Sequence, residues 1–391
     1  MQQKPTIIQR SFFLFAIFLS LLFIYEFYLF HSEWNRHSLV EDFNKSQIKK
    51  HQTQSAYPSM STLTYLSLYS QLKDTEQKLL PLSGFPYSHT IVCKEEEELE
   101  YFSDRYGFNN KDSNWDFLTI DAAFIGDSYI QGYCVRPEHH FISLLSPYYQ
   151  ILNLGLFGSG PLSELGILHE FAAIKKPQYV FWTYMSNDLT EDLPSEETHP
   201  LLFPYLFNKS QNLLNSKDPL LKVQKAYFTL LEQADSAFSF KSFFTLQKTR
   251  AQILNFFLKL TRNSLVRNNG QADYLQTSPI NWSLYGQVLN KALILTKNWN
   301  GKFIFLYLPD PEQWNPDHQR KINLFKQNLF SLVQELGIEI LDFSEVLKKE
   351  KNPLELYSVF NGQYGHFNSK GQELLSHYLK QYLEKNMSSP Q

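Results

Sequence analysis

Hydrophobic residues gather in five short runs that are typical of buried parallel β-strands, and the first of them ends in a glycine. Amphipathic patterns typical of helices lie between and after them, at 139–145, 162–174, 283–297, 319–336 and 369–383. Strands joined by such long crossovers predict an α/β fold in which helices cover both faces of a parallel sheet. The predicted strands are 121–126, 150–154, 178–184, 302–308 and 338–343.

A longer apolar run covers residues 11–30, where Glu26 is the only charged residue. At 1.5 Å per residue, a helix of this length spans roughly the 30 Å of a bilayer core. A cleaved signal peptide is the alternative. However, the run exceeds the roughly 7–15 apolar residues of such a peptide, and no small-residue cleavage site follows it. The pattern therefore predicts a retained transmembrane signal anchor.

The charges around this anchor favour a cytoplasmic N-terminus only weakly. Lys4 and Arg10 precede the run, but basic residues also follow it, so the positive-inside bias is small. We expect the first segment inside the cytoplasm and the bulk of the chain outside it. The predicted organisation is a cytoplasmic tail (1–10), the anchor (11–30), a membrane-proximal stalk (31–90), a folded domain (91–385) with a helical insertion (195–280), and a C-terminal tail (386–391).

Composition and charge exclude several classes of protein. Hydrophobic residues make up 43 % of the chain, too many for a disordered protein. The net charge of −3 argues against nucleic-acid binding, which favours a basic surface. Cys93 and Cys134 are too few for a disulfide scaffold or a four-cysteine zinc site, and whether they form one bridge stays open. His139 and His140 point to different faces and have no third ligand at helical spacing, so we expect them on the surface and predict no metal or other cofactor.

The strongest chemical signal is Gly126-Asp127-Ser128, which comes directly after a predicted strand. Ligands of open α/β sheets bind outside the carboxyl ends of the strands. A serine on a tight turn there presents both its hydroxyl and its backbone N–H to a ligand. An ordinary turn with a helix-capping serine is an equally good explanation of these three residues alone.

Three further features follow in order along the chain. Gly158, in NLGLFGSG after the second predicted strand, lets backbone amides approach a ligand closely. Asn187 follows the third strand and can aim its side-chain amide at a developing oxyanion. His366, in GHFN before the last helix, can act as a general base if the chain brings it back to Ser128.

With these residues the sequence resembles the SGNH/GDSL hydrolases, over roughly residues 85–385. The four blocks IGDSY, NLGLFGSG, YMSND and GHFN stand in the family's order. DRYGFNN and KPQYVFWTYMSNDLTEDL look like a membrane- or envelope-associated bacterial branch. The resemblance implies a three-layer α/β/α sandwich.

The roles of individual residues follow from the same resemblance. Ser128 would be the nucleophile and His366 its base. The backbone N–H groups of Ser128 and Gly158, with the side chain of Asn187, would form the oxyanion hole. Asp127 would be a structural residue that bonds turn amides.

One departure concerns the acid that usually precedes the family's catalytic histidine, since no carboxylate lies between Glu355 and His366. Three possibilities remain open. Gln363 or a backbone carbonyl orients His366 in a dyad, a distant carboxylate such as Asp342 or Asp188 takes the role, or the site is degenerate. The dyad is favoured because serine and histidine are both retained.

The predicted function is that of a serine-dependent esterase or O-acyltransferase that forms an acyl-enzyme. Its expected substrate is an acylated cell-envelope glycan or a lipid-linked ester. The expected location is the bacterial inner membrane, held by residues 11–30 with the domain on the extracytoplasmic side. The alternatives are a non-catalytic envelope or glycan-binding protein and a lipid-directed lipase or thioesterase. We expect no nucleic-acid partner, and the oligomeric state stays open.

Overall fold

The computed structural model describes residues 17–28, 56–58, 79–93, 99–214, 280–360 and 363–387. The chain divides into two compact units, residues 1–53 with 225–273 and residues 54–224 with 274–391. In the first unit the described part is a helix over 17–28, and no helix of the described residues is long and apolar enough to cross a membrane. The ends of the predicted span 11–30, the tail 1–10 and most of the stalk 31–90 lie outside the described residues.

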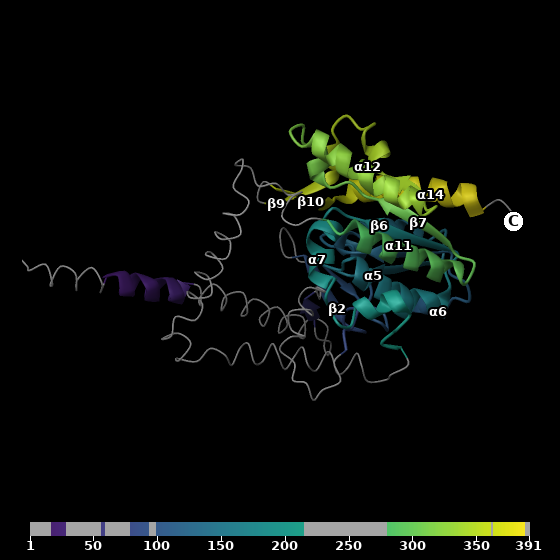
Figure 1. Ribbon diagram of the computed structural model, residues 1–391, viewed down its shortest axis with the longest axis horizontal. Coiled ribbons are helices and arrows are strands. Elements are labelled where there is room, and N and C mark those ends of the chain that lie inside the picture. Colours follow the sequence, from purple (N-terminus) through teal and green to yellow (C-terminus); the bar gives the residue numbers. More distant parts are fainter. Residues whose placement is uncertain are drawn as a thin grey trace, which may run out of the picture. The chain divides into compact units, whose positions relative to one another are not determined.

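The second unit is built on a sheet of five parallel strands in the order β5-β4-β6-β7-β8 (Figure 1). All five strands predicted from the hydrophobic pattern are confirmed. Because neighbours such as β4 and β6 are not consecutive, the connections cross over the sheet as helices. The strands are β4 (Ala122–Gly126), β5 (Ile151–Gly155), β6 (Tyr179–Tyr184), β7 (Lys302–Tyr307) and β8 (Glu339–Asp342).

Helices cover both faces of this sheet, so the predicted three-layer α/β/α arrangement is confirmed. One layer holds α4 and α14, and the other holds α5 and α11, with α11 against β7 and α12 against β8. The α-helices are α3 (Ser128–Gln131), α4 (Phe141–Leu145), α5 (Pro161–Ile167), α6 (Ala173–Lys175), α7 (Leu193–Glu196), α11 (Trp282–Lys297), α12 (Gln319–Glu335), α13 (Ser344–Leu347) and α14 (Ser369–Met387).

Short helices of other types complete the unit. The 3₁₀ helices are η1 (Asp112–Asp116), η2 (Pro137–His139), η5 (Phe203–Phe207), η6 (Pro311–Trp314) and η7 (Pro353–Leu356). The π-helical turns are η3 (Leu168–Ala172) and η4 (Asp188–Asp192).

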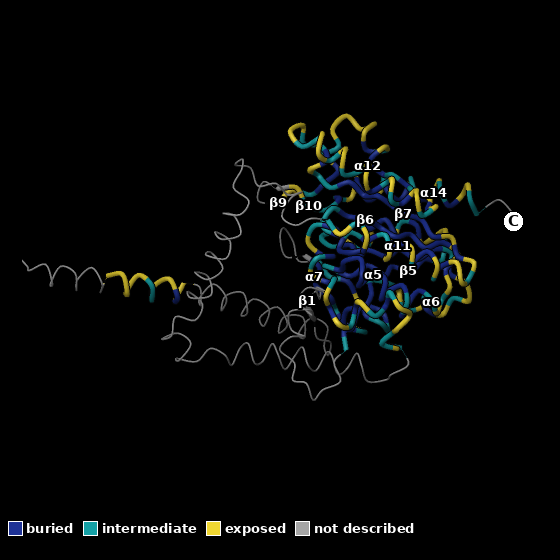
Figure 2. Tube along the Cα trace, in the orientation of Figure 1, coloured by how far each residue is buried: buried dark blue, intermediate teal, exposed yellow. Residues whose placement is uncertain are grey.

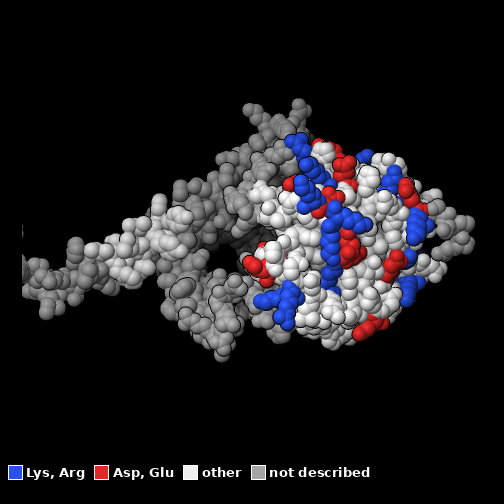
Figure 3. Space-filling view, turned by 90° about the horizontal axis from the view of Figure 1, so that it is seen from above, with Lys and Arg blue, Asp and Glu red and all other residues white. Residues whose placement is uncertain are grey.

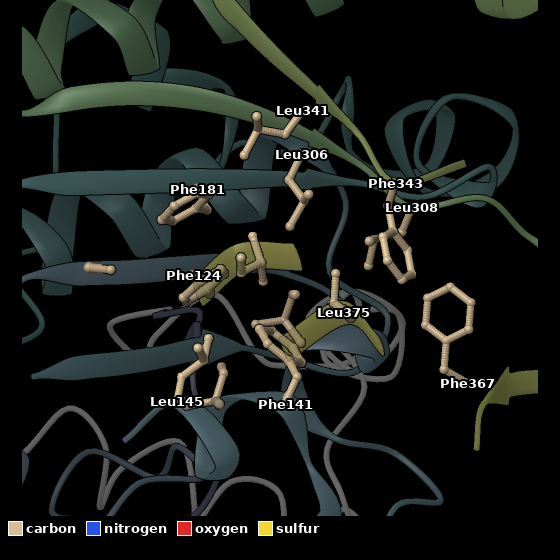
Figure 4. Packing of buried hydrophobic residues seen from close by; sticks show 14 of the residues in the cluster. Phe124, Phe141, Leu145, Phe181, Leu306, Leu308, Leu341, Phe343, Phe367 and Leu375 are labelled. Atoms are coloured by element: carbon tan, nitrogen blue, oxygen red, sulfur yellow. The ribbon is translucent and has the colours of Figure 1, made fainter. Parts of the chain in front are cut away.

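The central strands are buried on both faces, which explains why their sequences are continuous apolar runs (Figure 2). On the face of α4 and α14, Phe124 stacks on Phe181 with ring centroids 4.5 Å apart and meets Phe141 edge to face (Figure 4). On the other face, Tyr184 packs against Tyr285 of α11. The sheet is thus a rigid platform for the loops at its carboxyl edge.

Two small sheets stand beside the main one. One has the order β1-β2-β3, with β1 (Ala56–Pro58), β2 (His89–Cys93) and β3 (Leu99–Phe102), and the other is the antiparallel hairpin of β9 (Tyr357–Phe360) and β10 (Gln363–Phe367). Residues 79–90, which the sequence pattern assigned to the stalk, are packed into this unit. Leu80, Leu82 and Phe85 are buried, so the folded part begins before residue 91.

The predicted insertion 195–280 also begins later than expected. Leu202, Tyr205 and Leu213 are buried, and the Tyr205 hydroxyl donates a 2.7 Å hydrogen bond to Glu170. Residues 195–214 therefore belong to the α/β unit, while 215–279 lie outside the described residues. At the other end, α14 continues to Met387, beyond the predicted start of the tail at 386.

On the face seen in Figure 3, charged side chains of both signs lie close to one another. This mixture agrees with the small net charge of −3.

Candidate active site

Ser128 is placed by the end of β4. The strand ends at Gly126, and Asp127 then caps α3 by accepting a 2.9 Å hydrogen bond from the backbone N–H of Tyr129. Ser128 is the first residue of α3. The predicted structural role of Asp127 in the turn thus agrees with the observed hydrogen bond. Because the turn is held by this cap, the Ser128 hydroxyl has a defined position at the carboxyl edge of the sheet.

His366 reaches the same point from 238 residues away. The distance from Ser128 Oγ to His366 Nε2 is 2.8 Å. The backbone around His366 is fixed on both sides, since Ser358 Oγ donates to the His366 carbonyl and the Tyr129 hydroxyl donates to the Gly365 carbonyl. The hairpin β9–β10 therefore holds the imidazole against the serine, as the dyad hypothesis requires.

The GHFN block anchors this hairpin to the core. Phe367 is buried and packs against Tyr357, with ring centroids 4.8 Å apart. Asn368 accepts hydrogen bonds from the backbone N–H groups of Lys370 and Gly371, so it caps the start of α14. The residues after His366 thus fix where the strand ends and the helix begins.

Burial lowers the pKa of His366 to about 4. The imidazole is then neutral near pH 7, and with its proton on Nδ1 it can accept the proton of Ser128 at Nε2. Among the described residues, none hydrogen-bonds Nδ1 of His366. The side chain of Gln363, the predicted orienting residue, lies outside the described part, although its backbone belongs to β10.

The two distant carboxylates considered from the sequence are engaged elsewhere. Asp342 forms an ion pair with Lys326, with an N–O distance of 2.5 Å, and accepts a hydrogen bond from Ser344. Asp188 accepts from the backbone N–H of Met185 at 3.0 Å. Neither bonds His366 in the described structure, so the observed arrangement is a serine–histidine pair without a third acid.

Aromatic rings line the histidine. The rings of Tyr129 and Tyr133 lie 4.4 and 5.3 Å from the His366 ring, between centroids. Tyr133 in turn stacks on Phe157, with centroids 4.8 Å apart. Because Phe157 directly precedes Gly158, this chain of rings places the glycine-rich loop beside the Ser128–His366 pair.

Two of the predicted oxyanion donors are free to bind a ligand. Gly158 has φ = +65°, a left-handed backbone that favours glycine. In the described part of the chain, no oxygen accepts the backbone N–H of Ser128 or of Gly158. Asn187 behaves differently, since its Nδ2 donates to Asp192 at 2.6 Å and to Asp127 at 3.4 Å. Its role toward an oxyanion stays a prediction.

The sequence pattern did not identify the buried carboxylates behind this loop. Glu196 accepts hydrogen bonds from the backbone of the glycine-rich segment, and Asp192 accepts from Asn187. A signal was present, because Asp188, Asp192 and Glu196 recur every four residues and so share one face of a helix. This spacing was missed because Glu196 lies within 195–280, the segment that the sequence pattern assigned to an insertion.

Burial raises the pKa values of these acids. The pKa of Glu196 is raised to about 7 and that of Asp192 to about 8, and the pKa values of Glu164 and Asp188 lie well above their ordinary values. Neither carboxyl oxygen of Glu164 has a hydrogen-bond partner among the described residues. These groups are therefore more protonated in the folded chain than in the unfolded chain at neutral pH.

We expect the free energy of unfolding to fall between about pH 7 and pH 9. Over this range the buried acids bind more protons in the folded state than in the unfolded state, whose Asp and Glu titrate near 4. Below about pH 6.5 the buried histidines, whose pKa values are lowered to about 4, act in the opposite direction. The stabilisation from the acids is complete below about pH 4 and is lost as the pH rises through the folded values of about 7 for Glu196 and about 8 for Asp192. For Glu196 alone this is on the order of 3 kcal/mol.

Urea unfolding at several pH values measures this dependence. Glu164→Gln removes one buried acid and should make the dependence shallower, whereas Glu138→Gln, at an exposed position, should leave it unchanged. Stability that holds constant or rises toward pH 9 would contradict the prediction.

A cavity of about 160 Å³ adjoins Asn187 at the carboxyl ends of β6 and β7. Its lining includes the rings of Tyr184 and Phe325 and the side chain of Leu308, together with three carboxylate residues, Glu191, Asp310 and Glu312. A cavity of roughly 150 Å³ is large enough for one benzene molecule. The site therefore has room beside Asn187 for a substituent of about six non-hydrogen atoms.

Two of the smaller expectations have clear outcomes. Whether the cysteines form a bridge was left open by the sequence, and Cys134 is disulfide-bonded, while the side chain of Cys93 lies outside the described residues. The expectation that His139 and His140 both lie on the surface is wrong for His140, which is 2 % exposed because η2 and α4 pack it into the unit. Among the described residues, no group of three His, Cys, Asp or Glu side chains could hold a metal ion.

The fold and site define a class: a three-layer α/β/α protein with a serine–histidine pair at the carboxyl edge of a parallel sheet. No protein-family model matches the chain, and no curated protein sequence is significantly similar to it. Solved structures do match it, and descriptions as GDSL-type lipolytic proteins, esterases and acylhydrolases recur among them.

Three of these structures illustrate the degree of similarity. The lipase/acylhydrolase from Enterococcus faecalis is 12 % identical, with 68 % of this chain and 95 % of that chain covered and a TM-score of 0.38. A GDSL-like lipase from Bacteroides thetaiotaomicron is 11 % identical, with 68 % of this chain and 87 % of that chain covered and a TM-score of 0.36. The psychrotrophic esterase EstA from Pseudoalteromonas sp. is 10 % identical, with 68 % of this chain and 98 % of that chain covered and a TM-score of 0.35. Similarity this low carries no functional assignment, so the chemistry rests on the geometry of Ser128 and His366.

Proposed function

We propose that this protein is an ester hydrolase of the SGNH/GDSL type that works through an acyl-enzyme on Ser128. The observation that carries the proposal is the 2.8 Å contact between Ser128 Oγ and His366 Nε2. A nucleophile within hydrogen-bond reach of a neutral base is the arrangement that activates a serine. The N–H groups of Ser128 and Gly158, which no oxygen of the described residues accepts, supply further donors.

The reaction then proceeds in two stages. Ser128 Oγ attacks the ester carbonyl carbon while its proton passes to His366 Nε2, and negative charge develops on the carbonyl oxygen. The N–H groups of Ser128 and Gly158 stabilise that charge, and each such donor contributes about 10²–10³-fold. When the intermediate collapses, His366 returns the proton to the leaving alkoxide, and the acyl group stays on Ser128.

In the second stage an acceptor hydroxyl removes the acyl group. If the acceptor is water, His366 takes its proton and the products are a carboxylic acid and free Ser128. If the acceptor is a sugar hydroxyl, the same steps make the protein an O-acyltransferase. Both outcomes use the same residues, and the exclusion of water from the site decides between them.

An acylated cell-envelope glycan or a lipid-linked ester is the substrate class that we propose. The cavity beside Asn187 offers room for a small substituent of such a substrate. The apolar run 11–30 supports attachment to a membrane. The disulfide of Cys134 supports a location outside the cytoplasm, where such bonds persist.

A reporter fused after Gln391 tests this location. Alkaline phosphatase, which is active only outside the cytoplasm, should be active in the fusion, and a fusion lacking residues 1–30 should lose that activity. An active cytoplasmic reporter such as β-galactosidase at the same position would refute the proposed topology.

Turnover of p-nitrophenyl acetate that depends on Ser128 tests the proposed chemistry.

One observation favours a second candidate, a non-catalytic glycan-binding protein: Nδ1 of His366 has no acid partner in the described structure. In triad enzymes, loss of that acid's function lowers kcat about 10⁴-fold. The two candidates differ in whether the protein hydrolyses any ester at all.

A further inference from the structure

Asp192 and Glu196 lie one helical turn apart on the segment that follows Asn187, across η4 and α7. Both side chains are buried. Asp192 Oδ2 accepts a 2.6 Å hydrogen bond from Asn187 Nδ2. Asp127 also accepts from this amide, at the longer distance of 3.4 Å, so the shorter contact that directs the Asn187 amide is the one to Asp192.

Glu196 fixes the position of the glycine-rich loop in a similar way, by accepting hydrogen bonds from its backbone. Its carboxylate accepts the backbone N–H groups of Gly160 at 2.9 Å, Leu162 at 2.8 Å and Ser163 at 3.3 Å, and also the Ser163 hydroxyl at 2.5 Å. These donors lie at the start of α5, directly after Gly158. Four hydrogen bonds to one buried carboxylate leave the loop little freedom to move.

Gly160 shows how closely the two segments approach. A Cβ atom at this position would lie 2.6 Å from Asp192 Cβ and 2.8 Å from Glu196 Oε2. Only glycine allows this contact without displacing one of the two segments. The packing therefore couples the loop of Gly158 directly to the segment that carries Asp192 and Glu196.

From these contacts we infer that Asp192 and Glu196 are positioning residues of the oxyanion hole, Asp192 through the amide of Asn187 and Glu196 through the loop of Gly158. This inference rests on the proposed function, because it assigns a task within that same site. One segment then sets the second and third donors of the hole together, while Ser128 supplies the first. Donors act on a transition state only when their placement is accurate, and an error of 1 Å costs about 10²-fold.

A double-mutant cycle separates this role from a general contribution to folding. In full-length protein with p-nitrophenyl acetate, Asn187→Ala should lower kcat about 10²-fold. Asp192→Ala should lower kcat about tenfold or more, with KM little changed. Asp192→Asn, which keeps an acceptor oxygen for Asn187, should restore most of the loss. The Asn187→Ala/Asp192→Ala double variant should be no slower than Asn187→Ala alone, because Asp192 acts through a side chain that is already gone.

Glu196 is tested with a neighbouring control. Glu196→Gln loses part of its acceptor capacity and should lower kcat about tenfold. Glu197→Gln, whose carboxylate bonds the exposed amide of Asn281, should leave kcat unchanged. Thermal unfolding of each variant checks that the fold persists.

The outcomes distinguish the inference from the proposed function. Additive effects in the cycle, or an Asp192→Asn variant as slow as Asp192→Ala, would overturn the positioning role while Ser128-dependent turnover persists. Turnover that is the same in Ser128→Ala and wild type would overturn the proposed function itself, and the positioning role with it.

Discussion

Ser128→Ala should lower kcat for p-nitrophenyl acetate by at least about 10³-fold. The variant lacks the atom that attacks the carbonyl carbon, while the backbone N–H of residue 128 and the loop of Gly158 remain. Ser128 is only 7 % exposed, and the missing oxygen is small, so the fold should persist. Steady-state kinetics on the purified full-length protein measure the effect, and an unchanged thermal unfolding midpoint shows that the loss is chemical.

Ser195→Ala is the matched control, since this serine is exposed and donates to the Glu191 carbonyl on its own helical turn. Its kcat should equal that of wild type. If Ser128→Ala also equals wild type, the protein has no serine-dependent esterase activity. The non-catalytic glycan-binding candidate would then be the better description.

His366→Ala is expected to lower kcat by about 10³-fold or more, because Ser128 loses the base that accepts its proton. The Ser128→Ala/His366→Ala double variant should be about as slow as either single variant. Residues that act in one step lose their joint contribution when either is removed. The same kinetic assay measures all three variants.

The control for this prediction is His377→Ala, at an exposed position of α14. Its activity should not change. If His366→Ala keeps nearly full activity while Ser128→Ala does not, another group activates the serine and the dyad is wrong. If the double variant is much slower than both single variants, the two residues act in separate steps.

Much of the fold was predictable because its signals are local. Runs such as 121–126 and 178–184 are apolar at every position since both faces of β4 and β6 are covered, and that requirement is readable one strand at a time. The placement of Ser128 and Asn187 at the carboxyl edge follows equally simply. Parallel strands end on the same side of a sheet, so residues after them meet there.

The boundaries of the unit were less predictable. The mixed polar and apolar residues around Leu80 and Phe85 suggested a stalk, and the break in the strand–helix alternation after residue 195 suggested an insertion. In both segments buried side chains such as Tyr205 attach the chain to the unit. The apolar positions were visible in the sequence, but their pattern did not show which unit they pack against.

The roles of the two positioning carboxylates, Asp192 and Glu196, were also not predictable from the sequence. Asp192 and Glu196 read as ordinary polar residues of a helix, because their significance lies in donors contributed by Asn187 and by the backbone after Gly158. The burial that raises their pKa values is likewise a property of the packed unit. Spacing along the chain showed that they share a face, but it did not show what that face meets.

The amino-acid sequence alone determined the α/β architecture, the order of the strands along the chain and the identity of the serine, glycine, asparagine and histidine that form the candidate site. These depend on hydrophobic periodicity and on short motifs, which act within a few residues. The tertiary structure decided that His366 lies 2.8 Å from Ser128, with no third acid bonded to His366 among the residues that the structure describes, and that one buried segment holds both Asn187 and the loop of Gly158. Such contacts join residues far apart in the chain, and only the packing of the complete unit sets their distances.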